Sequence, residues 1–170
     1  MKDAVGSLKQ MDLSGLSDLV PLSKLMAALS NLDDNCNILF KGGALALLSD
    51  GIEVVASLPN TPETQEILHS LVQTLSHMAA HDGQGKICEA IIKFGLHKEI
   101  AAVVSERSKD KVLAALATEF FKHLALNAQN GLEMIHDGTM KKIMDLGQIF
   151  DDDDLILGNI QAMVLKLGAR

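Results

Sequence analysis

The sequence predicts an all-α fold built from stacked helical repeats. Ten-residue segments that begin at Lys24, Ser70 and Leu116 share one pattern of apolar and polar residues, and they lie 46 positions apart. A fixed period of this length is typical of helical repeat proteins. The 170 residues include no Trp or Tyr and only 5 Phe, so aliphatic side chains must fill the core. That composition suits closely packed helices better than strands.

Each copy of the segment carries apolar residues at i, i+3, i+4 and i+7, which predicts one apolar stripe on a helix. A degenerate fourth copy follows the third at an offset of 43. The stripes are Leu25, Ala28, Leu29 and Leu32; then Leu71, Thr74, Leu75 and Met78; then Ala117, Phe120, Phe121 and Leu124; and last Ile160, Met163, Val164 and Leu167. We expect these stripes to pack against the rest of the chain.

Two further helices separate successive copies. A short apolar segment ends at a glycine (Gly43, Gly95 or Gly138), which allows a sharp turn without a Cβ clash. A second helix then follows, from Ala44 to about Leu58, from Leu96 to about Ser105 and from Thr139 to about Phe150. The sequence therefore predicts one domain over 1–170, with a partial leading unit at 1–33 and three-helix units at about 34–81, 82–127 and 128–170.

Helix start signals agree with this division. Thr61-Pro62-Glu63 combines a capping residue, a proline for the first turn and an acid near the positive helix end. Asp110 precedes another apolar run, and four consecutive aspartates precede Leu155. We interpret the run at 151–154 as acids at a helix N-terminus, with an acidic landing patch for a basic partner as the alternative.

Charge and composition restrict the classes of partner. The net charge of −7 argues against nucleic acid or an anionic membrane as the main partner. No secretory signal is evident at the N-terminus, and no apolar stretch approaches the roughly 20 residues of a spanning helix. These features predict a cytoplasmic location. Cys36 and Cys88 fall in first helices of different units, so we expect reduced, buried thiols rather than a disulfide.

The three-helix unit resembles the armadillo repeat. The resemblance is carried by Ala27-Ala28-Leu29-Ser30-Asn31-Leu32, by Gln73-Thr74-Leu75-Ser76-His77-Met78-Ala79 and by Ile91-Ile92-Lys93-Phe94-Gly95-Leu96. It implies a right-handed superhelical solenoid of about three to four repeats, for which a HEAT-like helical array is the alternative. In armadillo proteins the third helices line a concave groove that binds extended peptides. The family's groove Asn falls on Asn31, His77, His123 and Lys166, and its groove Trp falls on Ala27, Gln73, Glu119 and Ala162.

The groove positions depart from the family pattern. No groove Trp is present and one groove Asn remains, which argues against a nuclear-import receptor of the importin-α type. A strongly basic groove of the β-catenin type is also missing. We therefore expect a non-catalytic interaction module or adaptor that binds a peptide or helix of a partner protein, without a cofactor or metal. The expected partner-binding residues are Asn31, Gln73, His77, Glu119, His123 and Lys166, with His81 and Lys122 as rim contacts.

Several motifs have simpler interpretations. The histidines are either a hydrogen-bonding ladder or ordinary surface residues, and His77 with His81 supplies two metal ligands without an evident third. Gly83-Gln84-Gly85-Lys86 lacks the first glycine and the Ser or Thr of a phosphate loop, so a turn between helices is expected. The aspartate run lacks the glycine and final Glu of an EF-hand.

Two alternative functions stay open. The array can pair with itself or extend a larger solenoid through its ends, because Leu165 places an apolar residue where the earlier copies carry Ser30, Ser76 and Lys122. The stripe around Val164 would contribute to that contact. The second alternative is an all-α enzyme with an unrecognised site, which predicts a deep pocket holding titratable groups of perturbed pKa.

Overall fold

The computed structural model describes residues 16–168, and these form ten helices and no strand. The prediction of an all-α fold is confirmed. The helices are α2 (Leu16–Leu29), α3 (Asp33–Lys41), α4 (Ala44–Ser57), α5 (Pro62–Ala80), α6 (Lys86–Phe94), α7 (Leu96–Glu106), α8 (Lys111–Leu124), α9 (Ala128–His136), α10 (Thr139–Ile149) and α11 (Asp154–Gly168).

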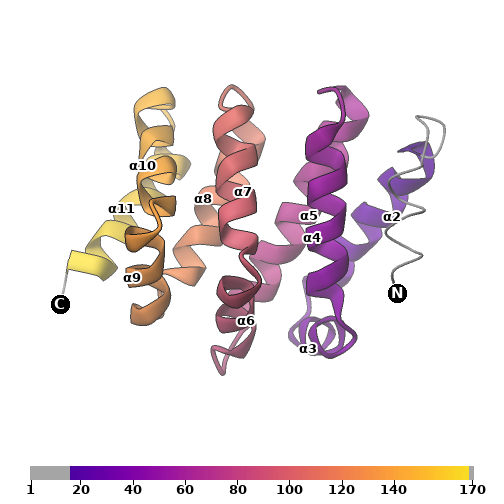
Figure 1. Ribbon diagram of the computed structural model, residues 1–170, viewed down its shortest axis with the longest axis horizontal. Coiled ribbons are helices and arrows are strands. Elements are labelled where there is room, and N and C mark those ends of the chain that lie inside the picture. The colour runs from indigo at the N-terminus through magenta and orange to yellow at the C-terminus, as the bar shows by residue number, and fades with distance from the viewer. Residues whose placement is uncertain (1–15, 169–170) are drawn as a thin grey trace.

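The helices are arranged in two layers that advance together along the long axis of the molecule (Figure 1). In one layer α2 packs on α5, α5 on α8, and α8 on α11. In the other layer α4 packs on α7 and α7 on α10, and the short helices α3, α6 and α9 lie at one end of these three. Helices α2 and α11 consequently lie at opposite ends of the described structure, and each layer presents equivalent helices in succession.

The predicted start signals form helix caps. The Thr61 side chain accepts a hydrogen bond from the Thr64 N–H, the Thr64 side chain accepts one from the Thr61 N–H, and Pro62 begins α5. The Asp110 carboxylate accepts a hydrogen bond from the Leu113 N–H at 2.9 Å. Such caps satisfy amide groups that the first helical turn leaves without partners.

The turn between the first and second helix of each unit depends on a glycine. Gly43, Gly95 and Gly138 have φ angles of 83°, 81° and 81°. A side chain is disfavoured in this left-handed region, so the three glycines allow the chain to reverse where other residues would be strained. The predicted helix boundaries at Ala44, Leu96 and Thr139 are confirmed.

The core lies between the two layers and contains the second and third predicted stripes. Leu71, Thr74, Leu75 and Met78 are buried on α5, and Ala117, Phe120, Phe121 and Leu124 are completely buried on α8. The rings of Phe120 and Phe121 meet edge to face with centroids 5.0 Å apart, a geometry that aromatic quadrupoles favour.

The prediction that the first stripe is buried is wrong. Leu25, Leu29 and Leu32 are 54%, 44% and 63% exposed, and Ala28 is exposed as well. Because α2 packs on α5 with its other face, Ala27 and Ser30 are buried instead. In α5 the equivalent stripe is covered by α3 and α4, the other helices of its unit. No described helix packs on the corresponding side of α2.

The fourth stripe is correct in part. Met163 is buried and Ile160 and Leu167 are half-buried, but Val164 is 44% exposed. Val164 is exposed because no described helix packs on the outer side of α11. Residues 1–15 of the expected leading unit lie outside the described residues. None of the helices within residues 16–168 is long and apolar enough to cross a membrane.

Candidate functional site

Six of the predicted binding residues lie on the outer surface of the layer formed by α2, α5, α8 and α11, which we call the histidine face. They are Asn31, Gln73, His77, His81, Glu119 and His123, and each is at least partly exposed. Asn31 follows α2, three residues belong to α5 or its end, and two belong to α8. The regular packing of these helices brings residues from three different units onto one surface.

His77 is anchored to the preceding unit. Its Nδ1 atom lies 3.2 Å from the carbonyl oxygen of Ala27 and 3.0 Å from the Ser30 hydroxyl oxygen. A carbonyl oxygen only accepts, and the Ser30 hydroxyl already donates to the same carbonyl. Nδ1 therefore carries the proton, and it satisfies a carbonyl at the C-terminal end of α2. The other ring nitrogen, Nε2, has no hydrogen bond to another described residue.

His81 forms an ion pair with Asp33 between its Nδ1 atom and the carboxylate. Asp33 is 75% exposed and His81 is 32% exposed, so solvent screens the pair and it contributes little to the free energy of unfolding. The contact orients the His81 imidazole at the point where the end of α5 meets the start of α3. His81 was predicted as a rim contact, and it lies at this junction.

His123 has a lowered pKa. Burial is the main cause, because it disfavours the charged imidazolium, and the neighbouring Lys122 ammonium, His81 and His77 act in the same direction while Glu119 opposes them. Because α5 packs on α8, the three histidines His77, His81 and His123 come from neighbouring helices of two units. At neutral pH the His123 ring is uncharged, and it therefore offers one hydrogen-bond donor and one acceptor.

Asn31 and Gln73 line one small cleft between α2 and α5. Its volume is about 230 Å³, and its walls also include Lys24, Ala27 and Ser70. Each of the two side-chain amides can donate and accept hydrogen bonds. Glu119 is exposed on α8 and adds a negative charge to the same face.

The remaining predicted contacts have other surroundings. The Lys122 ammonium donates a hydrogen bond to the Asn159 side-chain oxygen at 2.9 Å, so it connects α8 to α11. Asn159 is 5% exposed and donates to the Thr118 hydroxyl. Lys166 is exposed near the end of α11. Ala27, at a groove-Trp position of the armadillo pattern, is 6% exposed and contributes to the surface only as part of the cleft wall between α2 and α5.

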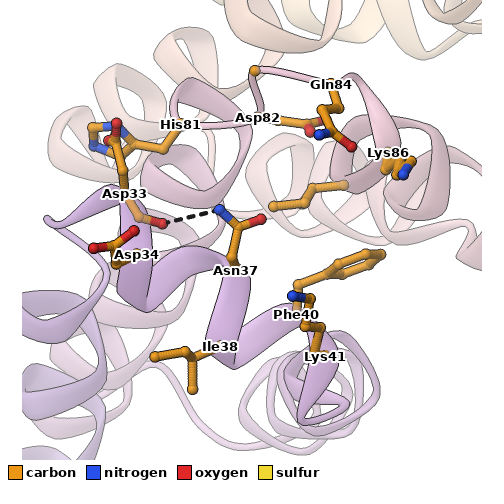
Figure 2. Close-up of a pocket in the computed structure, with 12 residues that line it drawn as sticks. Asp33, Asp34, Asn37, Ile38, Phe40, Lys41, His81, Asp82, Gln84 and Lys86 are labelled. Carbon is orange, nitrogen blue, oxygen red and sulfur yellow. Dashed lines mark hydrogen bonds and ion pairs between the residues drawn. The ribbon is translucent and has the colours of Figure 1, made fainter.

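A larger cavity of about 900 Å³ opens beside the histidine face, between α3 and the turn from α5 to α6. Figure 2 shows Asp33, Asp34 and Asn37 on one wall, and Asp82 and Gln84 facing them from the turn between the helices. Charges of both signs line the cavity, because Lys41 and Lys86 also contribute. His81 lies on its edge, so the cavity continues the histidine face. The sequence analysis did not identify this cavity, which forms from two units.

Three aspartates link successive units in a way that sequence reasoning missed. One carboxylate oxygen of each aspartate accepts a hydrogen bond from a backbone N–H at the start of a helix. The other oxygen contacts a histidine or lysine side chain of the preceding unit. The pairs are His69–Asp110, His97–Asp137 and Lys111–Asp153, each 2.8 Å long. The signal in the sequence is an aspartate one or two residues before a helix, but the basic partner lies too far along the chain to be found by spacing.

These contacts account for the aspartate run. Asp153 caps α11, and a hydrogen bond from Lys111 is the main cause of its lowered pKa. Asp154 is the first residue of the helix. The prediction of acids at a helix N-terminus is therefore confirmed. Residues 83–85 likewise form the expected turn between helices, and Lys86 begins α6.

The two cysteines are buried and unpaired. Burial is the main cause that raises the pKa of Cys88 to about 12 and raises that of Cys36. Both thiols therefore remain protonated, which is unfavourable for nucleophilic chemistry. The Cys36 thiol donates to the Ser30 carbonyl at 2.9 Å, so its role is in packing.

Within residues 16–168, no three side chains of His, Cys, Asp or Glu are grouped closely enough to hold a metal ion. Comparison with known proteins finds no matching family model, no similar curated protein and no similar solved structure. The functional argument therefore depends on the geometry of the histidine face and its neighbouring cavity.

Proposed function

We propose that the protein is a non-catalytic interaction module that binds an extended segment of a partner protein along the histidine face. One observation carries the proposal: side chains from successive helices of the same layer, His77, His123 and Gln73, gather on one partly exposed surface. A short right-handed solenoid of armadillo-like repeats is the architecture proposed with it. The recurring three-helix unit, with its short first helix, favours this over a HEAT-like array.

The chemistry of the face suits a peptide main chain. Side-chain amides and neutral imidazoles each donate and accept hydrogen bonds, as peptide groups do. Neighbouring helices pack about 8–10 Å apart, and an extended chain advances about 3.3 Å per residue. Successive helices would therefore contact a bound peptide about every three residues.

The surrounding charges favour a neutral or basic segment. Glu119 on the face and Asp34 in the adjoining cavity are exposed carboxylates, and the chain as a whole has a net charge of −7. Lys24 is paired with Glu66, so its charge is compensated. A basic side chain of the partner would be accommodated in the cavity beside His81.

Selection from a library of random 12-residue peptides tests the proposal, with binding measured by fluorescence anisotropy. Replacing both Gln73 and His123 by Ala removes two hydrogen-bonding groups, each worth about 1 kcal/mol, so we expect affinity to fall roughly tenfold or more. Lys142→Ala changes an exposed residue of α10, in the other layer, and serves as the matched control. Equal effects of both variants, or no selected peptide, would contradict the proposal.

A second function, extension of a larger scaffold, is favoured by the outer side of α11. Val164 and Leu165 are 44% and 63% exposed there. Phe121, which precedes Val164 by one repeat, is completely buried beneath the neighbouring helices. The outer side of α11 thus retains apolar residues at positions that are covered inside the array.

A further inference from the structure

A cavity that we call the amide pocket lies between the short helices α6 and α9, at the edge of the molecule where α3, α6 and α9 follow one another (Figure 1). Its volume is about 470 Å³, which is within the usual range of small-ligand sites. Its walls include Glu89, Ile92, Lys93, Phe94, Asn130 and Glu133. None of its lining residues belongs to the histidine face.

The amide pocket repeats the cavity beside His81, one unit further along the chain. One wall of each cavity is formed by residues at the same distances from the turn glycine of their unit. They are Asn37, Phe40 and Lys41, before Gly43, in the cavity beside His81 (Figure 2), and Glu89, Ile92 and Lys93, before Gly95, in the amide pocket. The stacking of the repeats therefore builds a cavity of the same construction at both unit boundaries.

The opposite walls differ in one buried residue. The cavity beside His81 has Ile87 there and the amide pocket has Asn130, each eight residues before the turn glycine of its own unit. Ile87 is 2% exposed and Asn130 is 4% exposed. An amide thus occupies a position that is apolar core in the neighbouring repeat. Departures of this kind from the rules of packing are expected at functional sites.

The side-chain amide of Asn130 has no partner within residues 16–168. It makes no hydrogen bond to another of these residues, and its Nδ2 atom is buried from solvent. Burying an amide without a hydrogen bond destabilises a fold, so an unpaired one in a cavity wall indicates that something else supplies its partner.

Glu133 is a second unsatisfied group, one helical turn after the amide and in the same wall. It is half-buried, and it makes no ion pair within the described part of the chain. The nearby lysines are compensated. The Lys93 ammonium lies 2.8 Å from a Glu89 carboxylate oxygen, and the Lys98 ammonium lies 3.5 Å from an Asp137 carboxylate oxygen. Glu133 therefore leaves one negative charge without a partner.

We propose that the amide pocket binds a short peptide segment that carries a basic side chain. The Asn130 amide pairs with a main-chain peptide group, because both offer N–H donors and a carbonyl acceptor. The terminal torsion of Asn is soft, so either end of its amide can turn to the ligand. The Glu133 carboxylate pairs with the basic group. The aliphatic part of that side chain lies against Ile92 and Phe94.

Binding of a short peptide should be weak and sensitive to salt. The pocket offers one amide pair and one charge pair, so we expect a dissociation constant of roughly 0.1–1 mM. The net charge of −7 also attracts a basic ligand, and added salt weakens that attraction.

Titration of the full chain with the tripeptide Ala-Lys-Ala, acetylated and amidated at its ends, measures this binding. Two-dimensional NMR of the ¹⁵N-labelled protein should show saturable shifts of the Asn130 side-chain N–H₂ resonances. Ala-Glu-Ala with the same blocked ends should bind roughly tenfold more weakly or not at all, because Glu133 repels it. Glu133→Gln should weaken Ala-Lys-Ala by a similar factor.

Asn130→Leu separates a binding role from a structural one. It supplies an apolar side chain like that of Ile87, so Tm should rise by about 2–4 °C while Ala-Lys-Ala no longer binds. Asn35→Leu is the matched control. Asn35 lies eight residues before Gly43 and donates a hydrogen bond to the Leu29 carbonyl at 2.9 Å, so its replacement should lower Tm and leave binding unchanged.

Three results would overturn the proposal. A lower Tm for Asn130→Leu would show that the amide stabilises the fold. Equal or tighter binding of Ala-Glu-Ala would contradict the role of Glu133. The absence of shifts with Ala-Lys-Ala up to about 10 mM would assign the unpaired amide to an ordered water. The test of the histidine face replaces Gln73 and His123, in the other layer, so failure at either site leaves the other unaffected.

Discussion

The Nδ1 atom of His77 lies 3.2 Å from the carbonyl oxygen of Ala27, so a residue of one repeat caps the helix of the repeat before it. The cap joins α5 to the C-terminal end of α2, where the Ser30 hydroxyl also donates to the same carbonyl. A residue placed in the predicted binding groove thus has a structural role as well. That dual role leaves Nε2 as the ring atom with which His77 would contact a ligand.

The cap predicts that His77→Ala lowers the free energy of unfolding by about 1 kcal/mol, the usual contribution of one hydrogen bond. Hydrogen exchange should accelerate at the end of α2 more than in α8. Gln73→Ala is the control, because Gln73 lies one helical turn earlier and makes no hydrogen bond to another described residue. Equal stability of the two variants in urea unfolding would show that the cap contributes nothing.

The buried contact between His97 and Asp137 predicts a dependence on acid. The His97 side chain is 1% exposed and Asp137 is 10% exposed. Burial acts to raise the pKa of Asp137, but the backbone and side-chain hydrogen bonds with Thr139 and the contact with His97 together lower it below its usual value of 3.8. In the unfolded chain Asp has a pKa of about 3.9. The contribution to stability is therefore fully present above the unfolded pKa, near pH 4, and is lost as the pH falls from there through the lower pKa of the folded state.

Asp137→Asn should reduce the free energy of unfolding by roughly 1–3 kcal/mol at pH 7. The difference from the unmodified protein should narrow as the pH falls below about 4. Urea unfolding between pH 3 and pH 7 measures both effects. Asp151→Asn provides the control, because Asp151 is exposed and makes no hydrogen bond or ion pair within the described part of the chain. A constant difference across this range would contradict the assignment.

His123 predicts a second loss of stability on acidification, at a higher pH, in which the group that takes up the proton becomes charged. Its folded pKa is below the ordinary 6.5, chiefly because of burial, so protonation favours the unfolded chain. The corresponding stability is fully present above about pH 6.5 and is lost as the pH falls from there through the lower pKa of the folded state. Proton NMR should give a His123 pKa below 6.5. Lys122→Met should raise this pKa and Glu119→Gln should lower it, and a shift in the reverse sense in either variant would show that His123 is not near those charges.

Local sequence signals were sufficient for the helices and their turns. Thr61, Asp110 and the glycines at 43, 95 and 138 act within a few residues of their own positions, so their effects were predictable. Burial of the stripes depended on neighbours. Leu75 is covered and Leu29 is exposed, although the local pattern around the two is the same. Periodicity identifies an apolar face, but the number of helices packed on it decides whether that face is buried.

The candidate site was predictable only in outline for a similar reason. The repeat placed Gln73, His77 and His123 on one layer, whereas the contact of His77 with Ala27 and the pairing of Lys122 with Asn159 join different units. The cavity beside His81 also needs residues from both sides of a unit boundary. Distances across such a boundary depend on how neighbouring repeats stack. The sequence pattern within one repeat carries no information about that stacking.

Two equivalent positions give a direct test of this dependence on neighbours. Phe121 on α8 is completely buried, whereas Val164, 43 residues later on α11, is 44% exposed. Phe121→Ala should lower the free energy of unfolding by about 3–5 kcal/mol, because it removes a buried aromatic ring and leaves a cavity. Val164→Ala should change it by less than about 0.5 kcal/mol at dilute concentration, as is usual for surface substitutions. Chemical unfolding of the two variants at a few concentrations provides the comparison. A large, concentration-independent loss for Val164→Ala would mean that the outer side of α11 is covered within the same chain.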